Sequence, residues 1–324
     1  MKRLILSISM MVFALLASAQ NDDWKQKEDS IRQVMKERML RWEKNRAIYN
    51  RMYEEDPYAT IDSVQQAERI ENEQLGIDRF EKLKRNTQID TLKEVNLSHA
   101  GLEAIPEFVY NAKAMEVLIL DYNQIKKLPK ELNDLPNLKR VYWRANSLDK
   151  FFWIRIPKNV NIEKLDISNN LLTRLPSGVK NLESLKELVV DQNFLDEIPI
   201  SRLSKAESIG TVSFNKSHTI SVQEGAYEKL ENIKVFKVNN SNLTSIDASL
   251  YKMPNLDELQ LQENSLSRIP EGISRMKTLT KLSFYKNQLT SLPSDIFDLN
   301  LKVIDLYYNE LEVVPDGIGN LKGL

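Results

Sequence analysis

The sequence contains no cysteine and only two histidines among its 324 residues. Without thiols, disulfide frameworks, cysteine nucleophiles, thiolate zinc sites and iron–sulfur ligation are excluded. The histidines, His99 and His218, are too few for a histidine-rich metal site, and no orienting group in register completes a catalytic triad around His99. The glycines form neither a phosphate-binding loop nor a dinucleotide fingerprint. We therefore predict no metal, no cofactor and no enzymatic activity.

Neither sign of charge predominates, because 45 basic residues stand against 46 acidic ones and leave a net charge of −1. Nucleic-acid binders draw much of their affinity from neutralising phosphates, so we predict no nucleic-acid partner. An apolar run long enough to cross a bilayer, about 20 residues, is also missing. Residues 4–16 form the longest candidate and are too short. The sequence therefore predicts no membrane insertion once any leader segment has been removed.

The first nineteen residues have the pattern of a secretory signal peptide. Residues 1–3 are basic at two positions, residues 4–16 are apolar, and residues 17–19 are the small residues expected before a cleavage site. The mature chain would begin near Gln20 in a periplasmic, cell-surface or secreted protein. Because export is combined with a lack of cysteine, the sequence favours a bacterial envelope or extracellular protein.

Residues 20–90 are rich in charge and predict an α-helical hairpin. Between Ile31 and Met52, apolar residues recur at steps of three, four and seven, which mark one helix face. A second helix is expected after Pro57, with a capping box that starts at Ser63. Its apolar members are Ile70, Leu75, Phe80 and Leu83, and Gly76 weakens its middle by about 1 kcal/mol. The hairpin would cap the repeats that follow; a dimerising coiled coil and disorder are the alternatives.

From residue 91 the chain repeats itself in ten units and begins an eleventh before residue 324. A landmark asparagine marks seven units: Asn123, Asn146, Asn170, Asn193, Asn264, Asn287 and Asn309. Ser217 and Ser241 occupy the equivalent places in the long interval, and Ala100 does so in the first unit. The alternation of Leu118 and Leu120 predicts a strand, and the return segments suit short helical or 3₁₀ turns. The asparagines can hydrogen-bond the turns between units.

This pattern resembles the 23-residue class of the leucine-rich repeat family, L-x-x-L-x-L-x-x-N-x-L-x-x-I/L-P. The resemblance implies an α/β solenoid: a horseshoe with a parallel sheet on its concave side, short helical or 3₁₀ segments on its convex side, and an all-α hairpin before it. It also implies that protein partners bind the concave sheet. Because Ala100, Ser217 and Ser241 replace the asparagine, we expect a weaker ladder there and local irregularity in the sixth unit, Ile209 to Val222.

Two clusters at outward positions of the predicted sheet are candidate binding sites. The first comprises Ile119, Tyr122, Tyr142 and Arg144, and the second comprises Tyr285, Tyr307 and Tyr308. Tyrosine and arginine are enriched at binding hot spots. A purely structural interpretation is also open, because Asp121 and Arg144 could neutralise each other and tyrosine favours strands. Trp143 is expected in the core, whereas the run 151–154 either widens the core or projects from an edge.

We therefore predict a non-enzymatic scaffold that recognises a protein partner, with a glycan as the less favoured ligand. In one alternative the solenoid is a rigid spacer, and the N-terminal helices or a missing C-terminal region bind the partner. In another it is the repeat arm of an enzyme whose catalytic domain lies beyond residue 324. The final residues form a return segment that stops where the next strand is expected, which favours a chain that continues.

Overall fold

The computed structural model describes residues 61–126, 129–146, 148, 161–313, 317, 319 and 321, with side chains from residue 69 onward. These residues belong mainly to the second of two compact units, which covers residues 67–324. The predicted signal peptide, the first predicted helix and the run 151–154 lie outside the described residues. None of the described helices is both long and apolar enough to span a bilayer.

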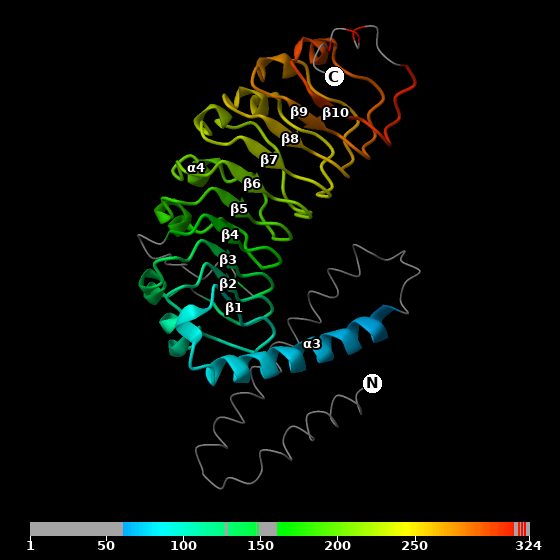
Figure 1. Ribbon diagram of the computed structural model, residues 1–324. Helices are drawn as coiled ribbons and strands as arrows, with labels where there is room; N and C mark the ends of the chain where they lie inside the picture. The colour runs from blue at the N-terminus through cyan, green and yellow to red at the C-terminus, as the bar shows by residue number, and fades with distance from the viewer. Residues whose placement is uncertain are drawn as a thin grey trace. The chain divides into compact units, whose positions relative to one another are not determined.

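Ten three-residue strands form one parallel sheet in which each strand pairs with the next one along the chain (Figure 1). Their bounds are β1 Glu94–Asn96, β2 Val117–Ile119, β3 Arg140–Tyr142, β4 Lys164–Asp166, β5 Glu187–Val189, β6 Thr211–Ser213, β7 Val235–Lys237, β8 Glu258–Gln260, β9 Lys281–Ser283 and β10 Val303–Asp305. Successive strands thus begin 22 to 24 residues apart, and equivalent positions of neighbouring units lie side by side.

Among the described residues, nine short helices lie in the segments that connect the strands or that precede β1. Eight are 3₁₀ helices: Ile89–Thr91, Glu107–Asn111, Lys130–Asp134, Ser177–Asn181, Tyr227–Lys229, Ala248–Lys252, Ile273–Arg275 and Ser294–Asp298. One is the α-helix α4, Ile200–Leu203. Several follow a proline, whose missing N–H costs nothing at the start of a helix. The predicted solenoid, with a parallel sheet and short helical or 3₁₀ return segments, is confirmed.

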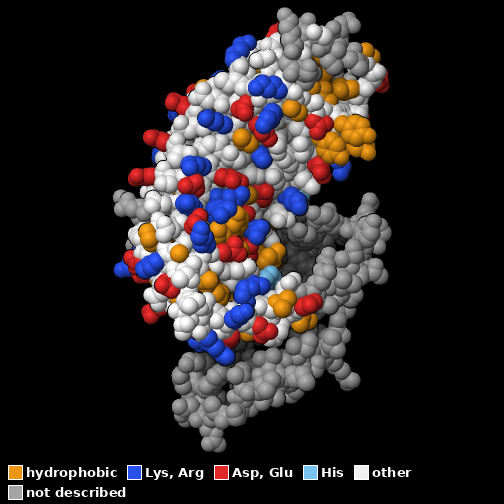
Figure 2. All heavy atoms as spheres, in the orientation of Figure 1, with side chains coloured by type: hydrophobic (Ala, Val, Ile, Leu, Met, Phe, Trp, Pro, Cys, Tyr) orange, Lys and Arg blue, Asp and Glu red, His pale blue; other side chains and the backbone are white. Residues whose placement is uncertain are grey.

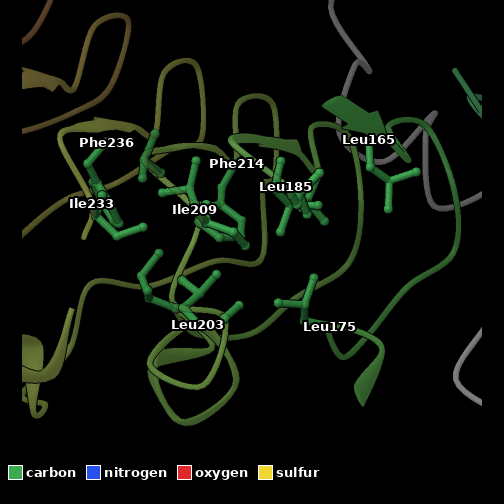
Figure 3. Close-up of a cluster of buried hydrophobic side chains, with 14 of the residues drawn as sticks. Leu165, Leu175, Leu185, Leu203, Ile209, Phe214, Ile233 and Phe236 are labelled. Atoms are coloured by element: carbon green, nitrogen blue, oxygen red, sulfur yellow. The ribbon is translucent and has the colours of Figure 1, made fainter. Parts of the chain in front are cut away.

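The core runs through the whole stack as one cluster from Ile89 to Leu321. Leu118 and Leu120 are completely buried, whereas Ile119 between them is half-buried and faces outward, as strand alternation requires. Figure 3 shows side chains of successive units interlocking between the strands and the return segments. Trp143 is buried, as predicted, and its indole N–H donates to the carbonyl of Ile125 at 2.9 Å.

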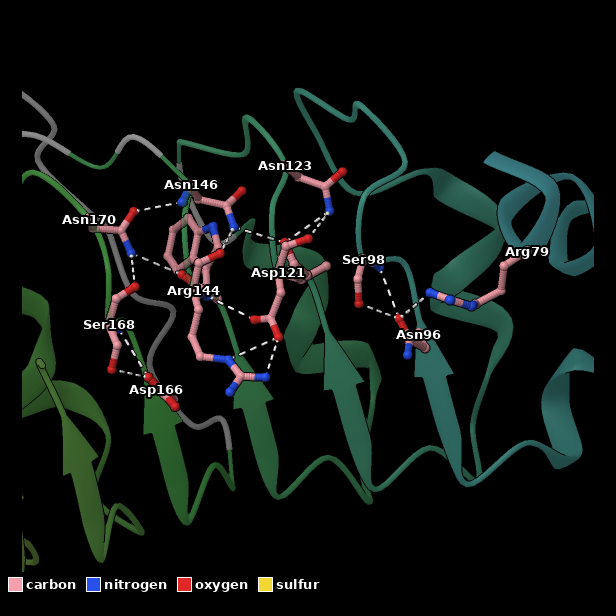
Figure 4. Close-up of polar contacts among 12 residues, drawn as sticks. Arg79, Asn96, Ser98, Asp121, Asn123, Arg144, Asn146, Asp166, Ser168 and Asn170 are labelled. Carbon is pink, nitrogen blue, oxygen red and sulfur yellow. Dashed lines mark hydrogen bonds and ion pairs between the residues drawn. The ribbon is translucent and has the colours of Figure 1, made fainter. Parts of the chain in front are cut away.

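Buried asparagines tie each turn to its neighbours (Figure 4). The Asn170 amide donates to the carbonyls of Trp143 at 3.1 Å and Ile167 at 2.9 Å, while its oxygen accepts from the N–H of Leu148 at 3.0 Å. Ser217 and Ser241 occupy equivalent buried positions. The Ser241 hydroxyl accepts from the N–H of Ser217 at 3.2 Å, but a hydroxyl has fewer hydrogen-bonding groups than an amide.

The sixth unit keeps its place in the sheet, because β6 and β7 pair in the common register. Its differences lie beyond the strands. The preceding return segment holds α4, and isolated parallel bridges join Glu197 to Ser221 and Val222 to Ile246. The Thr219 hydroxyl adds a hydrogen bond of 2.9 Å to the carbonyl of Leu195. The irregularity around this unit therefore lies in its turn and in the return segment that precedes it.

Every strand is followed, three residues after its end, by a non-glycine residue in the left-handed backbone region. The ten residues, with φ between 50° and 59°, are His99, Tyr122, Ala145, Asn169, Gln192, Lys216, Asn240, Glu263, Lys286 and Tyr308. This conformation costs roughly 1–2 kcal/mol for a residue with a Cβ. In most units the residue directly after this bend is a ladder asparagine, and its hydrogen bonds hold the chain in the bend.

Helix α3, Ile61–Lys84, packs beside the first unit through Gly76, Phe80 and Leu83. Gly76 is buried against the main chain of His99, and the Phe80 ring lies 5.9 Å from that of Phe108. Positions 76, 80 and 83 follow helical spacing and so share one face. Ile70 and Leu75 are 46% and 51% exposed. Of the four apolar members named from the sequence, Phe80 and Leu83 therefore pack against the first repeat, whereas Ile70 and Leu75 lie on the exposed side of the helix.

Candidate binding face of the sheet

The middle of the outward sheet face is a self-contained polar network. The half-buried carboxylate of Asp191 accepts from the Ser213 hydroxyl at 2.6 Å and from the N–H of Asn215 at 2.8 Å. Asn215 in turn accepts from the N–H of Asn239, also at 2.8 Å, and Asn239 accepts from that of Gln262. Burial raises the pKa of Asp191, although these hydrogen bonds oppose the shift. Because these groups satisfy one another, the middle strands have little unmet hydrogen-bonding capacity.

The first predicted cluster is largely assembled in the structure. Ile119, Tyr142 and Arg144 line one open hollow of about 270 Å³ on β2 and β3. The guanidinium of Arg144 lies 5.4 Å from the centre of the Tyr142 ring, and the Lys164 ammonium lies 6.0 Å from the same point. A cation over an aromatic ring is attracted to it, so both positive side chains contribute to the position of the Tyr142 ring.

Arg144 is fixed by Asp121 in the neighbouring unit (Figure 4). Its Nε donates to Oδ2 of Asp121 at 2.9 Å, and its backbone N–H donates to Oδ1 at the same distance. The hydrogen bond to Asp121 raises the pKa of Arg144. The side chain of Asp121 is only 5% exposed, whereas that of Arg144 is 46% exposed. The pair anticipated from the sequence is present, and it holds the arginine while leaving nearly half of it open to solvent.

Tyr122, the fourth residue of this cluster, does not line the hollow. It lies in the left-handed turn after β2, and its ring stacks on that of His99 with the centroids 4.3 Å apart. Burial lowers the pKa of His99, which favours the neutral imidazole. The strand register places Ile119 and Tyr142 side by side, whereas the turn directs the Tyr122 ring toward His99 of the first unit.

The second predicted cluster is brought together as predicted. The Tyr285 ring centre lies 6.3 Å from that of Tyr307 and 5.7 Å from that of Tyr308, and the last two are 4.3 Å apart. Tyr307 and Tyr308 are 66% and 61% exposed. Figure 2 shows hydrophobic side chains gathered at the β9–β10 end of the face. Such a surface cluster of aromatic rings is typical of a binding site.

Glu94, Val117 and Arg140 were not among the candidates from the sequence, yet they complete the first hollow. They occupy the first position of β1, β2 and β3, and the strand register places them in one outward row. Reading all three outward positions of each repeat, rather than two, would have found them. Glu94 also borders a second hollow of about 1010 Å³ that lies between α3 and β1.

Within the described ranges, no group of three or more histidine, aspartate or glutamate side chains is placed to hold a metal ion. The asparagines at the repeat landmarks donate to and accept from the backbone, and all but Asn309 are fully buried, so their role is structural. The outward face thus offers two surfaces to a ligand: an arginine-rimmed hollow near one end and a tyrosine cluster near the other.

The sequence matches the family model described as Leucine Rich Repeat at residues 161–182 and 300–321. It is 30% identical over 190 residues to lumican from Oryctolagus cuniculus, covering 53% of this chain and 92% of lumican. It is 28% identical over 181 residues to podocan from Mus musculus, covering 53% of this chain but only 28% of podocan. It is 24% identical to the adenylate cyclase of Schizosaccharomyces pombe, over 50% of this chain and 11% of the cyclase.

Two solved structures share the fold. The Toll–Spatzle complex of Drosophila superposes with a TM-score of 0.56 at 17% identity, over 74% of this chain and 36% of the matched chain. The plant peptide hormone receptor RGFR1 in complex with RGF2 gives a TM-score of 0.50 at 24% identity, over 72% and 39% of the two chains. The chain thus spans less than half of these two structures and less than a third of podocan and the cyclase.

Proposed function

Because this chain belongs to the leucine-rich repeat family, we propose that it is a non-enzymatic recognition scaffold that binds a protein partner on the concave face of its sheet. One observation carries the proposal: side chains suited to binding gather at two places on a face whose middle is internally hydrogen-bonded. Tyr307 and Tyr308 expose most of their surface, and Arg144 is held in place beside Tyr142. Neither arrangement is needed to pack the core.

A protein is the favoured partner because the two surfaces lie far apart. The first hollow is on β1–β3, and the tyrosine cluster lies beyond β9 and β10. Parallel strands are spaced by about 4.8 Å, so six intervening spacings separate the surfaces by roughly 30 Å. A folded protein can span that distance and contact both, whereas a small ligand would occupy only one.

A capture experiment with the full-length chain tests this proposal. Two double variants, Tyr142→Ala/Arg144→Ala and Tyr285→Ala/Tyr307→Ala, each remove one surface, and Lys229→Ala/Lys277→Ala removes two exposed cations of the return segments as a control. We expect a partner bound by the unaltered chain to be lost from at least one of the first two and retained by the third. Retention by all three would contradict concave binding and favour the rigid-spacer alternative.

We also propose that the chain is exported and that residues 20–90 cap the first repeat. Export is supported by the signal-peptide pattern of residues 1–19, and capping by the packing of Gly76 and Phe80 beside the first unit. Sequencing the N-terminus of the protein recovered outside the cytoplasm should give Gln20 as the first residue. An N-terminus that retains Met1 would contradict cleavage at this position.

A further inference from the structure

The hollow on β1–β3 combines apolar, aromatic and charged groups in a small volume. Its six lining residues are Glu94, Val117, Ile119, Arg140, Tyr142 and Arg144. A volume of about 270 Å³ lies below the roughly 300–1,000 Å³ typical of small-molecule sites. Because the hollow is also open, it suits one or two side chains of a larger molecule. Val117 and Ile119 offer the apolar contact that such a side chain would need.

Arg140 gives the hollow a positive charge that is not ion-paired, unlike the charges of the cations beside it. The adjacent cations are neutralised: Lys139 pairs with Glu116 at 3.7 Å, and Lys164 pairs with Glu187 at 2.7 Å. Arg144 is likewise held by Asp121. Arg140 is exposed and forms no ion pair within 4.0 Å among the described residues; the nearby carboxylate of Glu163 feels its charge but is ion-paired with Lys186 at 3.0 Å. A carboxylate from a partner would therefore find an unpaired guanidinium at the rim.

Glu94 limits which anionic partner fits. It lies on β1, on the opposite side of the hollow from β3, and within the described residues it has no cation paired with it. A molecule carrying closely spaced negative charges, such as a sulfated glycan, would be repelled by this carboxylate. A polypeptide can place one acid near Arg140 and direct an N–H group toward Glu94.

We propose that this hollow takes a segment of polypeptide in which a large apolar side chain stands beside an acidic one. The apolar side chain contacts Val117 and Ile119, and the acid pairs with Arg140. The guanidinium of Arg144 supplies a second donor at a fixed position, because its Nε and Nη2 are held by Asp121 and its side chain stays 46% exposed. This inference rests on the proposed function and specifies what the partner presents to one of the two surfaces.

The test is selection of a random peptide library, displayed on phage, against the immobilised full-length chain. We expect enrichment of peptides with aspartate or glutamate beside leucine, isoleucine or phenylalanine. Arg140→Glu should weaken their binding by about tenfold or more and, in a fresh selection, should enrich lysine or arginine in place of the acid. Lys277→Glu makes the same reversal of sign at an exposed return-segment position and should leave binding unchanged.

Each other outcome overturns the inference. It fails if no peptide is enriched, or if enriched acidic peptides bind Arg140→Glu and the unaltered chain equally. Peptides that lose binding only with Tyr285→Ala/Tyr307→Ala would move recognition to the tyrosine cluster and leave the proposed function standing. If heparin binds in a way that depends on Arg140 and no peptide is enriched, the ligand of the hollow would be a glycan and not a polypeptide.

Arg140→Gln controls for misfolding of the charge-reversed variant. It keeps a polar side chain and should give an intermediate loss of binding.

Discussion

Gly76 of α3 lies so close to the main chain of His99 that a methyl group at position 76 would fall 2.5 Å from the His99 carbonyl oxygen. Backbone cannot move aside as a flexible side chain can, so only glycine permits this approach. The contact joins α3 to the first turn of the solenoid, next to the hydrogen bond of 2.9 Å from Arg79 to Asn96. The glycine that appears as a weak point in a helix is thus the position where that helix fits against the repeats.

Gly76→Ala should therefore destabilise the protein, although alanine is the better helix former by about 1 kcal/mol. We expect a net loss of about 1–3 kcal/mol, because the clash must be relieved by shifting α3 away from the turn. Urea unfolding measures this loss. Gln74→Ala, at an exposed position of the same helix, is the control and should change stability little. A gain in stability for Gly76→Ala would contradict the close contact.

Asn170→Ala should be costly because it leaves several buried backbone groups without partners. Its side chain donates to Trp143, Ile167 and Ser168 and accepts from Asn146 and Leu148. Each unsatisfied buried group costs about 1–3 kcal/mol, and we expect a total of at least about 3 kcal/mol by chemical denaturation.

Asn255→Ala is the matched control for that experiment. Asn255 is exposed and donates a single hydrogen bond of 2.8 Å to the carbonyl of Glu231. We expect a loss of about 1 kcal/mol or less. Equal losses for the two variants would show that the ladder contributes no more than a surface hydrogen bond does.

Asp191→Asn should change how stability depends on pH. The pKa of Asp191 is raised in the folded state by burial, so the ionised carboxylate is disfavoured there relative to the unfolded chain. This penalty is absent below the unfolded pKa of about 3.8 and complete once the pH exceeds the folded pKa. The variant should therefore gain stability relative to the unaltered protein as the pH rises from below 4 to 7. Urea unfolding at several pH values measures the difference, and a gap that is constant with pH would contradict the shift.

Amide exchange should be faster near the two serines of the ladder. Ser217 and Ser241 each replace an amide with a hydroxyl, and β6 and β7 otherwise pair like their neighbours. We expect lower protection across residues 205–245 than in the flanking units, because local opening there breaks fewer hydrogen bonds. Protection equal to that of the flanking units would show that the bridges from Glu197 to Ser221 and from Val222 to Ile246 compensate.

The repeat pattern was sufficient to predict the solenoid, because each unit buries its leucines only against the next and the spacing therefore fixes the register. The same register predicted that Tyr285 and Tyr307 would be neighbours and that Trp143 would be buried. It did not predict the stack of Tyr122 on His99, because the direction of a side chain in a left-handed turn depends on backbone angles that strand periodicity does not contain. The close fit of Gly76 was missed for a related reason. Hydrophobic periodicity is read from side chains, and a glycine has none.

The left-handed residue that follows each strand has a consequence for engineering the solenoid. Lys216 and Gln192 occupy this bend with φ angles of 52° and 53°, and a residue without a Cβ would adopt it freely. Glycine at such a position would remove the side chain and, with it, the steric cost of the left-handed conformation. Where the side chain contacts nothing, the exchange would relieve backbone strain and stabilise the solenoid. At Tyr308 it would remove a ring of the tyrosine cluster, and at Tyr122 it would remove the stack on His99. The ten bends thus fall into two groups: positions where glycine can raise stability, and positions whose side chain is needed for a contact.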